Sequence, residues 1–188
     1  QKIVFGQYEG YGNEKNVAPQ SQTDTFYALK TFIKNGRFKD VPIYIRAGKK
    51  LKQTATEISI VFKNPHNVLI YRIQPNEGIV LKILTKEPGH EIKLKPEYMQ
   101  FCYRIDPKTH FFPEPYEKLL IDTIRGYQTF FNDAEEVEAQ WAFIDPLANT
   151  RGKPTFYEPG TWGPKDADEL LKEDGRAWLE PSMEFCRI

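Results

Sequence analysis

The residues with the most chemical potential lie in one short basic run, Arg46-Ala-Gly-Lys-Lys-Leu-Lys52. A strand-like apolar segment ends here, a glycine follows, and three lysines then occur within four positions. A glycine lets the backbone approach a ligand closely, and lysine side chains bind phosphate groups as point charges. The run therefore indicates a site for an anionic small molecule. Short basic clusters are also common on solvated surfaces, and the residue pattern by itself favours that simpler interpretation.

Arg72 and Gln74 form a second candidate pair. They share one face of a strand-like run because side chains alternate along a strand. If both are buried, they need polar partners, which a ligand could supply. If both are exposed, they belong to the solvent-facing side of a sheet. The histidines, His66, His90 and His110, lie in turn-like segments without a second ligand at metal-binding spacing. We therefore predict surface histidines and no metal site.

Length and composition narrow the class of protein. A chain of 188 residues, of which 26 are aromatic, predicts one folded domain with a real core. The 26 basic residues equal the 26 acidic ones, which argues against binding nucleic acid through bulk charge. No apolar run approaches the roughly 18 residues that span a bilayer. Cys102 and Cys186 form no CxxC pair, so we expect a buried thiol and a near-terminal thiol in a reducing compartment.

The elements that must position these residues are mostly strands in the first half of the chain. Residues 1–24 are punctuated by glycines and are expected to be irregular. Alternating or β-branched segments predict strands over 25–33, 41–46, 57–62, 67–74, 78–84, 90–94 and 98–104. Pro75-Asn76-Glu77 is typical of a turn, so the strands on either side of it are expected to form an antiparallel hairpin.

The hydrophobic period changes from 2 to 3.6 after Pro115, which predicts a helix reaching Phe131. A second helix is expected from an Asp133 N-cap to about Pro146, then a loop over 151–163, then a short helix from Pro164 that ends by Gly175. These elements indicate an α+β fold: a large, predominantly antiparallel sheet with helices packed on one face.

At the basic run the sequence resembles a known family, the glucose-6-phosphate dehydrogenases, and the resemblance extends through their C-terminal domain. The matching segments occur in the family's order, and they include Phe5-Gly-Gln-Tyr8, Val41-Pro-Ile-Tyr-Ile-Arg-Ala-Gly-Lys-Lys-Leu51, Arg72-Ile-Gln-Pro-Asn-Glu77, Pro115-Tyr-Glu-Lys-Leu-Leu-Ile-Asp-Thr-Ile-Arg-Gly126 and Gly160-Thr-Trp-Gly-Pro164. Each segment is short, but their shared order and spacing make the match specific.

The resemblance implies NADP-dependent oxidation of glucose 6-phosphate to 6-phosphogluconolactone, the entry step of the oxidative pentose phosphate pathway, in the cytoplasm. Family members bind the coenzyme mainly on an N-terminal Rossmann domain and assemble as homodimers or tetramers through the sheet of the other domain. The family's Asp-His-Tyr-Leu-Gly-Lys motif, which holds its general base, does not occur in this sequence. Residues 1–188 are therefore expected to be the C-terminal substrate-binding and dimerisation domain, inactive alone and without a catalytic residue.

Some site residues carry over from the family. Lys49 matches the substrate-contacting lysine, and Gln74 matches a residue of the substrate pocket. The family's second basic position is Thr54 here, a departure for which Lys50 or Lys52 are the candidate substitutes.

Some animal members also bind a second, structural NADP on this domain. Arg46, Arg72 and Lys82 match basic positions of that site. The sequence departs from the site's other positions at Ala55, Val80, Gln100 and Trp162.

Two other classes of function compete with the enzyme. One is a stand-alone dimerisation or binding module whose sheet presents a broad face to a partner; a start codon directly upstream of Gln1 would favour it. The other is nucleic-acid binding through Lys49, Lys50 and Lys52, which predicts affinity that falls steeply with salt. The neutral net charge argues against this second alternative.

Overall fold

The computed structural model describes residues 2–103, 114–181 and 185, and confirms the α+β class. The strands form two four-stranded sheets, with the orders β3-β2-β1-β8 (sheet A) and β4-β5-β6-β7 (sheet B). The chain divides into two compact units. Unit 1 comprises Gln1–Gln53 and Pro113–Trp178, and unit 2 comprises Thr54–Phe112 and Leu179–Ile188. The expected single sheet is thus two sheets. The first ends along the chain with β3 at Gly48, and the second begins with β4 at Thr56.

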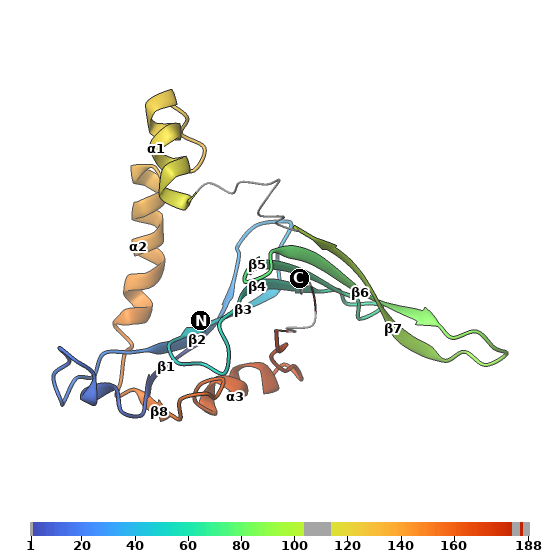
Figure 1. Ribbon diagram of the computed structural model, residues 1–188. Coiled ribbons are helices and arrows are strands. Elements are labelled where there is room, and N and C mark those ends of the chain that lie inside the picture. The colour runs from blue at the N-terminus through green and yellow to red at the C-terminus, as the bar shows by residue number, and fades with distance from the viewer. Residues whose placement is uncertain (1, 104–113, 182–184, 186–188) are drawn as a thin grey trace. The chain divides into compact units, whose positions relative to one another are not determined.

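Sheet A is built from β1 (Lys2–Tyr8), β2 (Phe26–Phe32), β3 (Pro42–Gly48) and β8 (Thr155–Tyr157). The strands β1, β2 and β3 are antiparallel neighbours, whereas β8 pairs parallel to β1 (Figure 1). β8 therefore brings residues from late in the chain beside its beginning. A short 3₁₀ turn, Tyr11–Asn13, follows β1.

Two strands of sheet A were not predicted from the sequence. Residues 1–24 contain β1, and the expected loop over 151–163 contains β8. The glycine in β1 misled the prediction, because Gly6 marks a close approach instead of a turn. A Cβ at Gly6 would lie 3.2 Å from Thr155 O and 3.2 Å from Pro164 Cγ. The three residues of β8 are too few for a periodic signal.

The core of unit 1 lies between sheet A and α3 (Asp166–Lys172). It consists of the buried side chains of Tyr8, Phe26, Ala28, Tyr157, Ala167, Leu170 and Leu171. Phe26 is only 2 % exposed and lies at its centre. The position of α3 agrees with the prediction of a short helix between Pro164 and Gly175.

The other two helices are α1 (Pro115–Arg125) and α2 (Ala134–Ala148). Asp133 caps α2 as predicted, because its carboxylate accepts the Glu136 N–H at 2.8 Å. The first helix is shorter than predicted: it ends at Gly126, whose φ of 72° is left-handed.

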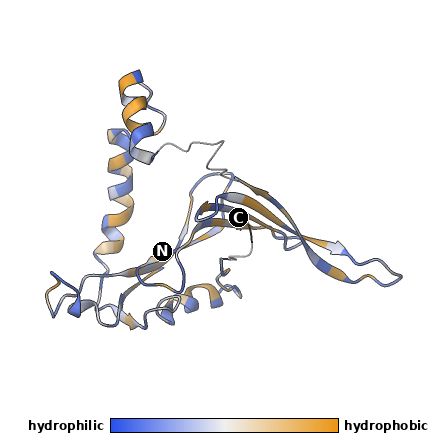
Figure 2. Cartoon of the chain, viewed as in Figure 1, coloured by the Kyte–Doolittle hydropathy of each residue, from blue (hydrophilic) through white to orange (hydrophobic). Residues whose placement is uncertain are grey.

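The apolar stripe of α1 and α2 is largely exposed, contrary to the expectation that all helices cover a sheet face. Tyr116 and Ile124 of α1 are 80 % and 85 % exposed, and Trp141 of α2 is 59 % exposed. Figure 2 shows hydrophobic and hydrophilic residues interleaved along both helices. Within the described residues, α3 is the helix that packs closely on sheet A.

Unit 2 is an antiparallel meander of β4 (Thr56–Val61), β5 (Val68–Gln74), β6 (Gly78–Lys86) and β7 (Leu94–Cys102). The predicted β5–β6 hairpin is confirmed, and Asn76 in its turn has a φ of 60°. The two short strands expected over 90–94 and 98–104 are one continuous strand, β7.

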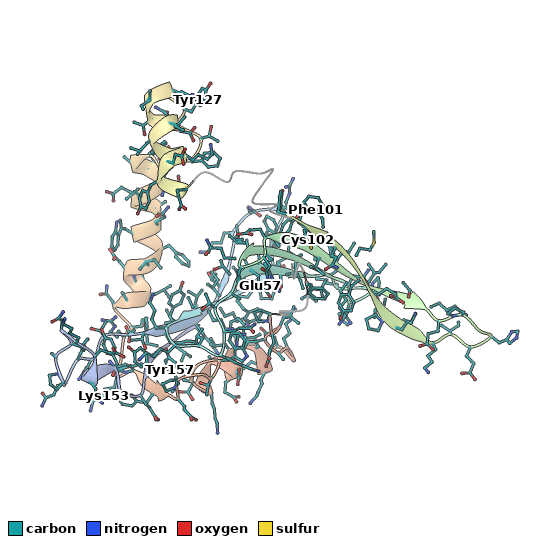
Figure 3. The ribbon with its side chains drawn as sticks, viewed as in Figure 1. Glu57, Phe101, Cys102, Tyr127, Lys153 and Tyr157 are labelled. Atoms are coloured by element: carbon teal, nitrogen blue, oxygen red, sulfur yellow. The ribbon has the colours of Figure 1, made fainter. Side chains whose placement is uncertain are left out.

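Cys102 lies at the end of β7 (Figure 3). It is disulfide-bonded, so the expectation of a free buried thiol is wrong. Spacing motifs such as CxxC identify bonded cysteines only when they are close in sequence, so the pattern gave no warning. The other cysteine, Cys186, lies outside the described residues.

An ion-paired cluster fastens the end of α3 to sheet A. Asp174 pairs with Lys30 at 2.6 Å and also accepts a hydrogen bond from the Tyr44 hydroxyl. The hydrogen bond from Lys30, followed by that from Tyr44, lowers the pKa of Asp174 below its usual 3.8. A lowered carboxyl pKa stabilises the fold above the ordinary pKa, and this contribution is lost as the pH falls through the folded-state value.

We expect Asp174→Asn to lower the melting temperature at neutral pH. The difference from the parent protein should disappear in acid, because protonation removes the same charge from the parent. Melting temperatures followed by circular dichroism from about pH 7 to about pH 2.5 would measure this. A difference that persists undiminished below the ordinary pKa would contradict the assigned ion pair.

Candidate functional site

The candidate site is the loop that follows β3, residues 48–53, here called the lysine loop. Backbone hydrogen bonds hold it at several points in unit 1. The Lys49 N–H donates to Thr25 O at 2.8 Å, and the Lys49 carbonyl accepts from the Tyr157 hydroxyl at 2.8 Å. Further along, Lys50 O accepts from the Gly160 N–H at 2.8 Å, and the Lys52 N–H donates to Thr161 O at 2.9 Å.

Gly48 allows the loop to leave β3 closely packed against the core. A Cβ at this position would lie 2.7 Å from Cδ2 of Phe26 and 3.1 Å from Cδ2 of Leu51. Phe26 is fully buried, so it has little room to move away. The sequence predicts a close backbone approach at Gly48, and in the structure the approach is to the protein's own core.

The first two lysines of the loop are in different environments. The Lys50 ammonium pairs with Glu14 and lies 4.5 Å from the centre of the Tyr8 ring. The hydrogen bond with Lys50 lowers the pKa of Glu14, and the same bond raises the pKa of Lys50. The Lys49 side chain is exposed, and no ion pair to it is found in the described part of the chain. Lys49 is therefore available to an external anion, whereas Lys50 is committed to Glu14.

Arg46, two residues before Gly48, is stacked between two tryptophans. Its guanidinium carbon lies 4.5 Å from the Trp162 ring centre and 4.6 Å from that of Trp178. The Trp178 Nε1–H donates to Ala167 O at 3.1 Å, which connects the stack to α3. Guanidinium groups stack favourably on aromatic faces, so this arrangement stabilises the end of β3.

The remaining candidates belong to unit 2. Arg72 is 5 % exposed and lies 3.4 Å from Glu57, and its guanidinium also donates to Phe185 O at 3.4 Å. Gln74 is exposed and pairs in register with Thr56, while Thr54 is exposed in the loop before β4. Lys82 is half-buried on β6. Arg72 and Gln74 share a strand face, but Arg72 is buried and Gln74 is exposed. The pair is therefore neither buried together nor exposed together.

The arginines give a test of the structural NADP assignment. A phosphate-binding site needs cationic groups that are open to the ligand. Arg46 is enclosed by two indole rings, and Arg72 is buried beside a carboxylate. Each guanidinium therefore already has partners within its own unit, and the assignment of Arg46, Arg72 and Lys82 to a structural NADP site stays a prediction.

Other classes of site are limited by what the structure describes. Within residues 2–103, 114–181 and 185, there is no cluster of three or more potential metal ligands. His66 and His90 are exposed, and His110 lies outside the described residues. None of the described helices is both long and apolar enough to span a membrane.

Sequence reasoning missed the residues that hold the lysine loop. Glu14 and Tyr157 lie in segments expected to be irregular, and Thr25 begins an expected strand without any sign that it would contact the loop. Tyr157 contacts Lys49 across 108 residues of sequence, and Glu14 contacts Lys50 across 36. No local pattern reports contacts of that range. Figure 3 labels Tyr157 among the side chains of unit 1.

Comparison with known proteins decides the family. A family profile described as "Glucose-6-phosphate dehydrogenase, C-terminal domain" matches residues 1–179. The chain belongs to this family. It is 39 % identical to the glucose-6-phosphate 1-dehydrogenase of Aggregatibacter actinomycetemcomitans, in an alignment that covers 96 % of this chain. It is 41 % identical to that of Chlamydia pneumoniae, in an alignment that covers 94 % of this chain.

Solved structures of the family agree with the fold. A crystal structure of glucose-6-phosphate 1-dehydrogenase from Mycobacterium avium matches 96 % of the chain with a TM-score of 0.80 at 29 % identity. A glucose-6-phosphate dehydrogenase in complex with its substrate glucose 6-phosphate matches 95 % with the same score at 30 % identity. The chain spans about 41 % of the length of each. It also spans 41 % and 40 % of the two curated relatives.

Proposed function

We propose that the chain is the C-terminal, substrate-contacting part of an NADP-dependent dehydrogenase that oxidises glucose 6-phosphate to 6-phosphogluconolactone. The observation that carries the proposal is Lys49: an exposed ammonium, without an ion pair among the described residues, on a loop held by four hydrogen bonds. A cation that extends from a fixed backbone suits the phosphate of a sugar phosphate. A curated relative and a solved structure are named glucose-6-phosphate dehydrogenases, and the solved structure holds its substrate glucose 6-phosphate.

The residues present indicate which steps this chain would support and which would need the rest of the enzyme. Lys49 would hold the phosphate and so orient the sugar. The assignment of Gln74 and Thr54 to the substrate stays a prediction from the family resemblance. Bound NADP supplies the hydride acceptor. We place the general base and most of the coenzyme site in the part of the enzyme outside this chain, because the family's motifs for them do not occur in the sequence. Residues 1–188 by themselves are therefore expected to be inactive.

The deciding experiment is to read the coding DNA upstream of the Gln1 codon and to assay the product of the complete gene. A glycine-rich strand–turn–helix signature followed by an Asp-His-Tyr-Leu-Gly-Lys run, together with NADP reduction that depends on glucose 6-phosphate, would support the proposal. A start codon directly upstream, with no reduction of NADP, would refute it. That outcome would favour a stand-alone binding or dimerisation module.

One face of sheet B supports a homodimer or a tetramer assembled through the sheet. The register places two apolar rows across its strands: Ile58, Tyr71, Ile79 and Phe101, and then Ile60, Leu69, Leu81 and Met99. Ile58, Phe101 and Met99 are 55 %, 56 % and 61 % exposed. A broad apolar face of this kind fits a second copy of the same chain, since stable interfaces bury about 1,000 Å² or more.

We expect Ile60→Asp to weaken that assembly about tenfold or more, because it places a carboxylate among apolar partners. Sedimentation velocity over a concentration series would measure the change. Ile92→Asp is the matched control, since Ile92 is 87 % exposed and lies outside the two rows. Equal association of both variants and the parent would contradict an interface on this face.

We also propose a cytoplasmic location. A doubly charged sugar phosphate does not cross a bilayer unaided, so an enzyme that consumes it must share its compartment. Cell fractionation with an antibody to the chain would test this, and recovery outside the cytoplasmic fraction would refute it.

A further inference from the structure

The lysine loop depends on a buried hydroxyl outside it. Tyr157 of β8 is only 3 % exposed, yet its hydroxyl reaches the loop. The Tyr157 Oη lies 2.8 Å from Lys49 O and 3.2 Å from both Oγ1 and O of Thr25. A phenol has one proton, and the shortest of these contacts identifies Lys49 O as its acceptor.

Thr25 completes the connection. Its carbonyl accepts the Lys49 N–H at 2.8 Å, and its hydroxyl accepts the Tyr8 N–H at 2.9 Å. The Thr25 hydroxyl therefore has its own proton free to donate to Tyr157 Oη. Hydrogen bonds thus run from the Tyr8 amide through Thr25 and Tyr157 to the Lys49 carbonyl, and both backbone polar groups of Lys49 are fixed.

The surroundings keep the tyrosine in place and protonated. Its ring packs against Phe26 with the ring centres 5.6 Å apart, and against Tyr8 at 6.4 Å. Burial raises the pKa of Tyr157 above its usual 10.0, so its hydroxyl remains a donor throughout the physiological range. Removing the oxygen alone would leave this packing intact.

We infer that Tyr157 is a positioning residue for the substrate phosphate and acts through Lys49, with Thr25 as its support. The inference rests on the proposed function, in which Lys49 binds that phosphate. Without the Tyr157 hydroxyl, the Lys49 carbonyl loses its partner while the Lys49 N–H stays bonded to Thr25. The peptide that follows Lys49 can then rotate, and the ammonium is no longer held where the phosphate binds.

The test is Tyr157→Phe in the product of the complete gene. We expect the KM for glucose 6-phosphate to rise about fivefold, the effect of one hydrogen bond. The kcat and the KM for NADP should stay within about twofold, because the chemistry and the coenzyme site are untouched. Tyr44→Phe is the matched control: it also removes a hydrogen-bonded hydroxyl from sheet A, but that hydroxyl contacts Asp174 and Arg176.

A double-mutant cycle with Lys49→Ala separates this inference from the proposed function. If Tyr157 acts through Lys49, Tyr157→Phe will not raise the KM further in the Lys49→Ala background. A raised KM in Lys49→Ala with an unchanged KM in Tyr157→Phe overturns the inference alone, as does an equal rise from Tyr157→Phe in both backgrounds. An unchanged KM in Lys49→Ala overturns the assignment of the phosphate to Lys49, and the inference with it, while the measured turnover still supports a glucose 6-phosphate dehydrogenase.

A second pair of variants covers the case in which Tyr157→Phe does not fold. Thr25→Val removes the supporting hydroxyl and keeps the side chain's shape, and we expect the KM for glucose 6-phosphate to rise as for Tyr157→Phe. Thr25→Ser keeps the hydroxyl and should retain the parent KM. Equal KM values for the two Thr25 variants would overturn the inference.

Discussion

Replacing Lys49 by alanine in the product of the complete gene should raise the KM for glucose 6-phosphate about 30- to 160-fold, which corresponds to about 2–3 kcal/mol for a charge-assisted hydrogen bond. The side chain is exposed, so the substitution removes the cation without opening a cavity. Both backbone polar groups of Lys49 keep their partners, so the loop should retain its course. The KM for NADP should not change, because Lys49 is assigned to the substrate alone.

Lys50→Gln is the matched control for this prediction. It removes a neighbouring positive charge in the same loop, but that charge is paired with Glu14. Steady-state kinetics at two ionic strengths would compare the variants. The parent KM should rise with salt, since a solvated phosphate contact is screened, and the Lys49→Ala KM should respond less. Equal KM increases in Lys49→Ala and Lys50→Gln would show that only the bulk charge of the loop matters.

The sequence predicted the elements with a strong local pattern. The β5–β6 hairpin, the Asp133 cap and the short helix after Pro164 all have signals within a few residues of one another, and the structure confirms them. β1 and β8 were missed for a different reason. β1 pairs with β2 across an intervening loop and with β8 from the other end of unit 1, and Gly6 permits the approach of β8. Pairing at such a distance leaves no trace in a local window.

In the candidate site, too, some features have a local sequence signal and others depend on contacts between distant parts of the chain. The family resemblance predicts that Lys49 contacts the substrate, whereas the residue pattern alone marks only a glycine followed by lysines. The features that distinguish it from Lys50 come from elsewhere in the chain: Glu14 neutralises Lys50, while Thr25 and Tyr157 fix the Lys49 backbone. Composition and spacing cannot rank adjacent lysines, because their availability depends on partners that the fold brings to them.

The packing beneath the loop leads to the largest expected effect on stability, that of Gly163→Ala. Gly163 has a φ of 103°, a conformation that costs an alanine about 1–2 kcal/mol. A Cβ there would also lie 2.3 Å from Cε2 and 2.6 Å from Cζ of Phe26. That ring is 2 % exposed and rests against Tyr157, so it cannot withdraw without disturbing the core. Overpacking of this kind costs a further 1–3 kcal/mol or so.

We therefore expect Gly163→Ala to reduce the free energy of unfolding by about 3 kcal/mol or more, and to lower the melting temperature by about 6–12 °C. Gly160→Ala is the matched control in the same segment, because Gly160 also has a positive φ, 85°, but no atom within 4 Å of its Cβ position. Gly160→Ala should lose only the stability that the positive φ costs an alanine. In Gly163→Ala, Phe26→Leu should restore part of the lost stability by relieving the clash, although Phe26→Leu alone is destabilising. Equal melting temperatures for the two glycine variants would show that backbone conformation alone, and not contact with Phe26, requires glycine at position 163.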